Sequence, residues 1–213
     1  MTVVDETGQG KSNCRLRISV DTRGTRDETV KFVGVRSGHP LLVTNGTHLS
    51  ANLDWNNQTN GSYLSAAVIL SPRKTNQNPL KTPEWLKIEY VGVPPGQNAR
   101  MSISLTGQGR ERILYTEGWP EANRSGRKIA QQKITFEILD QSLFRILEND
   151  QLVYESKLDK IPFRRAYLYL QVSSHSNYAN RSIYFDNIQV SGHGVTADMG
   201  SGLSITHAGL TRR

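Results

Sequence analysis

The sequence has little that could cross-link the chain or hold it in a membrane. Cys14 is the single cysteine among 213 residues, which excludes an intramolecular disulfide and a cysteine-based zinc site. The longest apolar run, 66–70, is far shorter than the roughly 20 residues that a membrane-spanning helix needs. A chain of this length buries enough surface to fold without a cross-link. These absences favour a protein built around one hydrophobic core, with no membrane span.

Several signatures of catalysis and targeting are missing as well. No Gly-x-Ser-x-Gly nucleophile elbow is present, and nothing like a phosphate-binding loop follows the Gly-rich stretch 107–110. The five histidines include no pair at the spacing of metal ligands. Residues 1–10 lack the basic-then-apolar order of a signal peptide. Binding functions and chemistry based on carboxylates or tyrosines remain to be tested.

Acidic residues are fewer than basic ones, with 19 Asp and Glu against 26 Lys and Arg, and the net charge is +7. Such a charge leaves nucleic acids, anionic glycans and acidic membrane surfaces open as partners. Part of it falls in the loop 110–128 and part at the two ends of the chain. Because no recognised nucleic-acid module accompanies the basic loop, we do not expect a nucleic-acid partner. The charge suggests instead a preference for anionic glycans.

Short alternating runs dominate the sequence, and sustained helical spacing is absent. In 133–139, Ile134, Phe136 and Ile138 share one face, as the two-residue period of a strand requires. Helix is expected over a turn or two at most, with 127–132 as the best candidate. The expected strands are 16–20, 30–35, 40–42, 49–53, 63–70, 84–91, 101–105, 112–116, 133–139, 142–148, 151–155, 165–173 and 182–190. About thirteen short strands with frequent turns predict an all-β sandwich of two antiparallel sheets.

Composition sets the two ends of the chain apart from the rest. Residues 1–29 are polar and charge-mixed, and they predict a polar extension or an edge strand. Residues 192–213 contain five glycines and predict a Gly-rich C-terminal tail. The sandwich itself is expected over 30–191.

A series of motifs in this region resembles the concanavalin A-like lectin/glucanase superfamily, including its laminin-G-like jelly rolls. The motifs are an apolar strand at 63–72, a tryptophan strand at 85–90, a hairpin at 144–154, an aromatic strand at 167–178 and the closing strand Ile-Tyr-Phe-Asp-Asn-Ile-Gln-Val at 183–190. The resemblance implies a jelly roll whose concave face usually holds a glycan. It fixes no activity, because members include lectins, carbohydrate-binding modules, glycoside hydrolases, polysaccharide lyases and protein-binding laminin-G-like domains.

One predicted face collects residue types that bind sugars. Tyr167, Tyr169 and Gln171 alternate with apolar residues on the strand 165–173, so they are expected to lie opposite the core. Pockets for small ligands combine aromatic side chains with a few convergent polar groups. We expect six further residues to complete the site: Trp85, Lys87, Glu89, His175, Asn177 and Tyr178. The prediction is a carbohydrate-binding, lectin-like domain that binds a polysaccharide on its concave face, although Trp85 fits core packing equally well.

A glycan-active enzyme that uses the same face is the alternative. The retaining glucanases of the superfamily carry Glu-x-Asp-x-Glu on one strand, and that motif is absent here. A carboxylate pair from different strands, such as Glu89 with Glu117, stays open. The face also supplies tyrosine, histidine and amide groups of the types that polysaccharide lyases use, without the motifs of the superfamily's alginate lyases. A laminin-G-like protein-binding module is the second alternative.

The resemblance also implies one structural calcium ion on the convex side of the sandwich. A carboxylate in the closing strand can contribute to that site, and Asp186 matches its position. Calcium takes six to eight oxygen ligands, so most of them must come from elsewhere. For a domain of this kind we expect an extracellular or cell-surface location.

Overall fold

The computed structural model describes residues 2–5, 14–24, 29–54, 64–91, 100–107, 109–116, 131–175, 181–192, 195–198 and 203–212. Regular structure in these ranges is almost entirely β, with two short 3-10 helices, η1 (Pro79–Lys81) and η2 (Asp140–Ser142). Neither is long or apolar enough to cross a membrane, and the described ranges contain no other helix.

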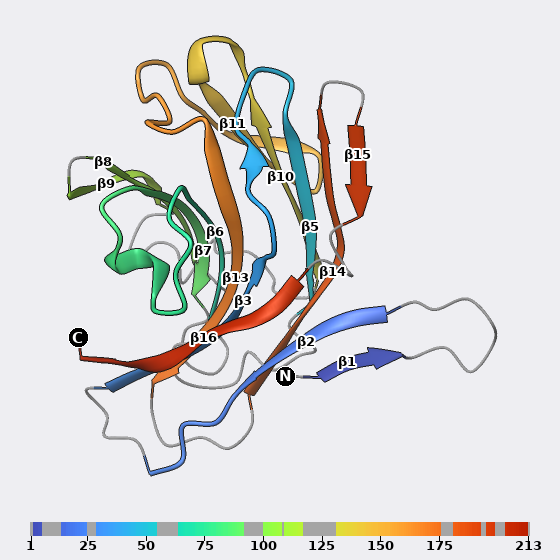
Figure 1. Ribbon diagram of the computed structural model, residues 1–213, viewed down its shortest axis with the longest axis vertical. Coiled ribbons are helices and arrows are strands. Elements are labelled where there is room, and N and C mark those ends of the chain that lie inside the picture. The colour runs from blue at the N-terminus through green and yellow to red at the C-terminus, as the bar shows by residue number, and fades with distance from the viewer. Residues whose placement is uncertain are drawn as a thin grey trace.

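The strands form two antiparallel sheets that pack face to face (Figure 1). Sheet A has the order β1-β2-β14-β5-β10-β11-β12, and β15 pairs with β14. Its strands are β1 (Thr2–Asp5), β2 (Cys14–Val20), β5 (His48–Asp54), β10 (Gln131–Ile138), β11 (Phe144–Glu148), β12 (Gln151–Glu155), β14 (Arg181–Gly192) and β15 (Val195–Asp198).

Sheet B has the order β16-β3-β13-β6-β7-β8-β9, and β4 pairs with β13. Its strands are β3 (Thr29–Ser37), β4 (Leu41–Leu42), β6 (Ser65–Ser71), β7 (Trp85–Val91), β8 (Arg100–Gly107), β9 (Arg110–Thr116), β13 (Arg165–His175) and β16 (Leu203–Arg212). Strands far apart in the sequence lie next to each other in both sheets, as in β2 with β14 and β3 with β13. The predicted two-sheet jelly-roll sandwich is therefore confirmed.

The hydrophobic core lies between the sheets. The alternation predicted for 133–139 and for 165–173 is confirmed, since the apolar residues of both strands are buried in one cluster: Ile134, Phe136, Ile138, Leu168, Leu170 and Val172. Each of the thirteen expected strands overlaps an observed one. The sequence found them because most are half-buried and keep the two-residue period.

The helix expected at 127–132 is wrong where the structure describes it. Gln131 and Gln132 begin β10 and pair with Asp54 and Leu53 of β5. Pairing within the sheet outweighs the good helical propensity of two glutamines, since tertiary contacts routinely override propensity. The preceding residues of that stretch lie outside the described ranges.

The sheets extend beyond the residues 30–191 that the sequence assigned to the sandwich. In the N-terminal region, β2 places Leu16, Ile18 and Val20 in the core. In the C-terminal region, β16 pairs with β3 from Leu203 to Arg212. Both regions lie at or near a sheet edge, since β2 pairs with the edge strand β1 and β16 is itself an edge strand of sheet B.

The predicted hairpin at 144–154 is confirmed and has a tight turn. Asn149 and Asp150 adopt left-handed backbone conformations, with φ of 50° and 64°. Asn and Asp tolerate this conformation better than other non-glycine residues, and two such residues in succession suit a two-residue hairpin. The Asn149 side chain accepts a 2.9 Å hydrogen bond from the amide of Lys133, which ties the turn to β10.

Candidate functional site

The outer face of sheet B, which points away from sheet A, carries most of the residues predicted to bind sugar. Tyr169 on β13 pairs with Ile69 on β6, which pairs with Lys87 on β7. Gln171 and Glu89 are related in the same way across β6. Two strand spacings of about 4.8 Å separate the two sets. The structure therefore brings the two halves of the predicted site onto one face.

The segment 72–84, called the cover segment here, lies against one end of this face (Figure 1). The Tyr169 hydroxyl donates a 2.7 Å hydrogen bond to the carbonyl of Arg73. The same hydroxyl accepts a 2.9 Å hydrogen bond from the amide of Thr75. Tyr169 is fully buried as a result. Its ring packs in the protein and is not exposed for a sugar to stack on.

Trp85 is held by the same segment. Its indole N–H donates a 3.1 Å hydrogen bond to the carbonyl of Leu80, and 3% of its surface is exposed. It belongs to a small apolar cluster, separate from the main core, whose buried members are Ala67, Ile69, Trp85 and Tyr169. Trp85 thus combines the two roles that the sequence left open: it lies on the predicted face and packs in an apolar cluster.

The polar members of the predicted site are also engaged within the protein. Lys87 donates a 2.8 Å hydrogen bond to Glu89, and its ammonium lies 5.7 Å from the centre of the Trp85 ring. Tyr167 is half-buried, with the Arg36 guanidinium 5.4 Å above its ring.

Gln171, which lies four residues before the end of β13, is 5% exposed. The remaining three predicted residues are His175, Asn177 and Tyr178, and they lie at or beyond that end. The backbone of His175, the last residue of β13, pairs with Val30 of β3. Asn177 and Tyr178 lie outside the described residues.

An open groove of about 420 Å³ lies where the cover segment meets the β8–β9 hairpin. Trp85, Thr106 and Glu111 line it side by side, because they are paired in register across β7, β8 and β9. Its other lining residues are Leu80, Lys81, Thr82, Pro83 and Gly109. We call it the Trp85 groove.

Thr106 is the unusual residue of the Trp85 groove. It is 4% exposed, and its hydroxyl oxygen is buried without a hydrogen-bond partner in the described structure. Leaving a buried polar group unpaired costs about 1–3 kcal/mol, so such groups are uncommon in folded proteins. Sequence reasoning missed Thr106 and Glu111, although the alternation of Ser102, Ser104 and Thr106 on β8 is a signal that could have placed Thr106 on this face.

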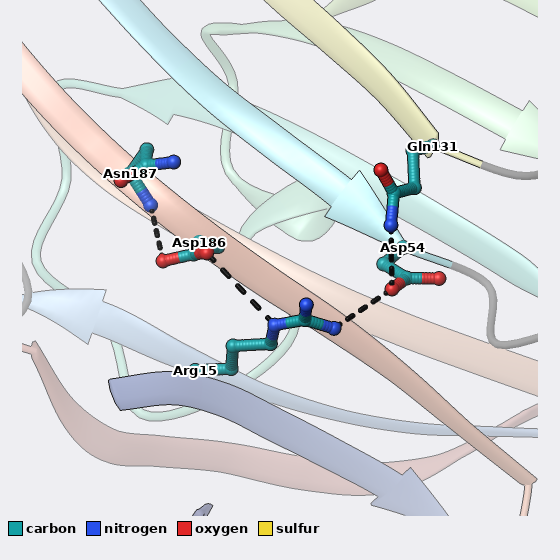
Figure 2. Close-up of polar contacts among 5 residues, drawn as sticks. All are labelled: Arg15, Asp54, Gln131, Asp186 and Asn187. Atoms are coloured by element: carbon teal, nitrogen blue, oxygen red, sulfur yellow. Dashed lines mark hydrogen bonds and ion pairs between the residues drawn. The ribbon is translucent and has the colours of Figure 1, made fainter. Parts of the chain in front are cut away.

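A second cavity, of about 310 Å³, lies on the outer face of sheet A (Figure 2). Arg15 donates a 2.9 Å hydrogen bond to Asp54 and lies 4.0 Å from Asp186. The Gln131 side-chain amide donates a 3.3 Å hydrogen bond to the same oxygen of Asp54. The backbone amide of Asn187 donates a 2.8 Å hydrogen bond to the Asp186 carboxylate. We call this cavity the Arg15 pocket.

Comparison with known proteins identifies the fold. No family model matches the chain, and no curated protein matches it. Among solved structures, the T. cruzi calreticulin globular domain matches with a TM-score of 0.56 at 12% identity, over 84% of this chain and 73% of that one. A Bacteroides ovatus mixed linkage glucan GH16 structure matches with a TM-score of 0.54 at 10% identity, over 86% and 84%. Both are concanavalin A-like jelly rolls.

The chain has a concanavalin A-like fold. The resemblance seen in the sequence motifs is therefore confirmed. At identities this low the likeness extends to the fold alone, and the activity has to be argued from the site.

The described residues around Asp186 do not by themselves fit the calcium ion that a concanavalin A-like fold implies. Asp186 and Asp54 both face the positive charge of Arg15. Within the described ranges, no three His, Cys, Asp or Glu residues are grouped so that they could hold a metal. A calcium ion needs six to eight oxygen ligands. Calcium binding stays a prediction from the resemblance.

One buried and one half-buried tyrosine of this concanavalin A-like fold predict a loss of stability at alkaline pH. Burial raises the pKa of Tyr169 above its usual value of 10, and burial together with nearby Asp159 raises that of Tyr154. As pH rises above 10, the unfolded chain releases these protons before the folded protein does, so the free energy of unfolding falls. Urea unfolding at a series of pH values measures this decline, and Tyr154→Phe should make it shallower. An unchanged slope in the variant would contradict the assignment.

Proposed function

We propose that this chain binds a polysaccharide in the Trp85 groove on the outer face of sheet B. The observation that carries the proposal is the buried, unpartnered Thr106 hydroxyl beside an indole ring and a carboxylate. A sugar hydroxyl would supply the missing partner of Thr106 once the side chains that cover it move aside on binding. Glu111 would accept hydrogen bonds from further hydroxyls, and Trp85 would contribute apolar contact.

Two further facts support a glycan as the ligand. The Bacteroides ovatus structure that shares the fold is a mixed linkage glucan GH16 in complex with a product. The exposed Lys81 offsets the Glu111 carboxylate in the lining of the groove, and the whole chain carries a charge of +7, which attracts anionic chains at longer range. The finer proposal is therefore that anionic polysaccharides bind more tightly than neutral ones, at an extracellular or cell-surface location.

Binding is favoured over hydrolysis by the carboxylates that the structure describes. Of the described residues that line the groove, Glu111 alone carries a carboxylate. Glycoside hydrolysis ordinarily uses two carboxyl groups on either side of the scissile bond. Glu89 lies on the same face but is paired with Lys87, and Glu117, its possible catalytic partner, lies outside the described residues.

The substitution Thr106→Val should lower the affinity for polysaccharide without lowering the stability of the fold. The substitution replaces an unpartnered hydroxyl by a methyl group of similar shape, so the free energy of unfolding should stay the same or rise slightly. The affinity for polysaccharide should fall about three- to tenfold, the worth of one hydrogen bond. Affinity electrophoresis against a panel of neutral and uronate-containing polysaccharides, with urea unfolding in parallel, measures both quantities.

Glu111→Gln tests the carboxylate of the groove, and Glu155→Gln on the exposed edge strand β12 is its matched control. We expect weaker binding from the first substitution and no change from the second. The proposal fails if the wild-type chain binds no polysaccharide of the panel, or if both glutamine variants bind as the wild type does. Release of reducing ends or of unsaturated sugars by the wild type would establish the enzyme alternative.

A further inference from the structure

The Arg15 pocket is a cavity on the opposite side of the sandwich from the Trp85 groove, and the sequence prediction of a sugar site did not include it. We propose that it is a second binding site, which holds the hydroxyl groups of a neutral sugar. This goes beyond the proposed function, because the pocket lies on sheet A and shares no residue with the groove.

The pocket is assembled from four neighbouring strands of sheet A. Arg15 comes from β2, Asp186 from β14, Asp54 from β5 and Gln131 from β10 (Figure 2). Side chains from adjacent strands that point to the same face of a sheet form a continuous surface. The site therefore rests on rigid elements and not on a single loop, which favours a fixed arrangement of its polar groups.

A β-bulge shapes the pocket at Asp186. The pairing of β14 with β5 shifts register between Asp186 and Gln189, and Asn187 has a left-handed φ of 48°. The bulge places the backbone amide of Asn187 where it donates a hydrogen bond to the Asp186 carboxylate. Bulges in sheets often occur beside binding sites, where they redirect a side chain.

The charges of the pocket nearly cancel. Arg15 and Lys133 supply two positive charges, and Asp54 and Asp186 supply two negative ones. The Arg15 side chain is 27% exposed, and the two carboxylate side chains are 21% exposed each, so all three can be reached from solvent. A pocket with this balance gives no net attraction to a strongly charged ligand.

Its hydrogen-bonding groups match a ligand that both donates and accepts. The carboxylates of Asp54 and Asp186 accept only, the guanidinium of Arg15 donates only, and the amide of Asn52 does both. Each hydroxyl of a neutral sugar donates once and accepts twice, so adjacent hydroxyls can bridge a carboxylate and the guanidinium. The geometry points to a pair of neighbouring sugar hydroxyls at the Arg15–Asp54 contact.

The experiment follows the side-chain amide signals of Asn52, Gln131 and Asn149 by nuclear magnetic resonance while cellobiose, lactose, maltose or sucrose is added to the full chain. We expect at least one disaccharide to shift these signals saturably. Asp54→Asn should weaken that binding about tenfold or more, since it removes hydrogen bonds to a charged group. Asp140→Asn, at the exposed first residue of helix η2, is the matched control and should bind like the wild type.

Thr106→Val distinguishes this site from the Trp85 groove. If the pocket signals still respond in that variant, the second site stands whether or not the groove binds polysaccharide. The proposal is overturned if no disaccharide shifts the pocket signals, if Asp54→Asn binds as the wild type does, or if Thr106→Val abolishes the response. A response to calcium chloride with none to any sugar would also overturn it, in favour of a cation site.

Discussion

Tyr169→Phe is expected to loosen the cover segment and to weaken polysaccharide binding at the same time. The Tyr169 hydroxyl makes two hydrogen bonds to the backbone of that segment, at Arg73 and Thr75. Phenylalanine keeps the ring in the apolar cluster but leaves one carbonyl and one amide without their partner. We expect the free energy of unfolding to fall by about 1–3 kcal/mol, because each of the two lost hydrogen bonds contributes about 0.5–1.5 kcal/mol.

The effect on binding follows from the same contacts. The cover segment contributes Leu80, Lys81 and Thr82 to the Trp85 groove, so a looser segment gives a less defined groove. If the cover segment has to become ordered when the ligand binds, the free energy of ordering it reduces the affinity. Urea unfolding and affinity electrophoresis on the same preparation measure the two losses.

Tyr167→Phe is the control for this prediction. Tyr167 lies on the same strand and the same face, but its contact is with Arg36 through the ring, which phenylalanine retains. We expect its stability and binding to stay close to those of the wild type. If Tyr169→Phe were as stable as this control, the two hydrogen bonds would not be what holds the cover segment.

The sandwich could be predicted from the sequence because its strands keep a regular alternation. In the central parts of β10 (134–138) and β13 (166–172) every second residue is apolar and buried, and this pattern alone assigns the core side. No individual strand was assigned in the end regions that hold β1, β15 and β16, because their polar and glycine-rich sequences suit a tail as well as an edge strand. Pairing with β2, β14 and β3 gives them their structure, and such long-range pairing leaves little trace in the local sequence.

The candidate site could be predicted only in part, for a related reason. Alternation correctly placed Tyr169 and Trp85 on the face opposite the main core. It carries no information about a segment that folds back over that face, so the Tyr169 ring was expected to be open to ligand and the choice between ligand contact and packing stayed open for Trp85. Thr106 and Glu111 depend on the register of three strands, which the sequence of each strand does not reveal. Arg15 and Asp186 likewise come from opposite ends of the chain.

The hydrogen bond between Tyr90 and Glu148 leads to the second large effect. Tyr90 on β7 of sheet B donates a 2.6 Å hydrogen bond to Glu148 at the end of β11 in sheet A. Tyr90 is 1% exposed and Glu148 is 6% exposed, so the contact joins the two sheets within the interior. Hydrogen bonds to charged groups contribute more to stability than neutral ones, about 1.5–3 kcal/mol. Tyr90→Phe should lower the free energy of unfolding by about that amount.

A double-mutant cycle isolates the contact from the other interactions of the two residues. Glu148→Gln keeps an oxygen that accepts from Tyr90 but removes the charge, so the bond weakens without being lost. The loss caused by Tyr90→Phe should therefore be smaller in the Glu148→Gln background than in the wild type. Urea unfolding of the wild type, both single variants and the double variant measures the coupling. Strictly additive losses would mean that the charge of Glu148 adds nothing to its hydrogen bond with Tyr90.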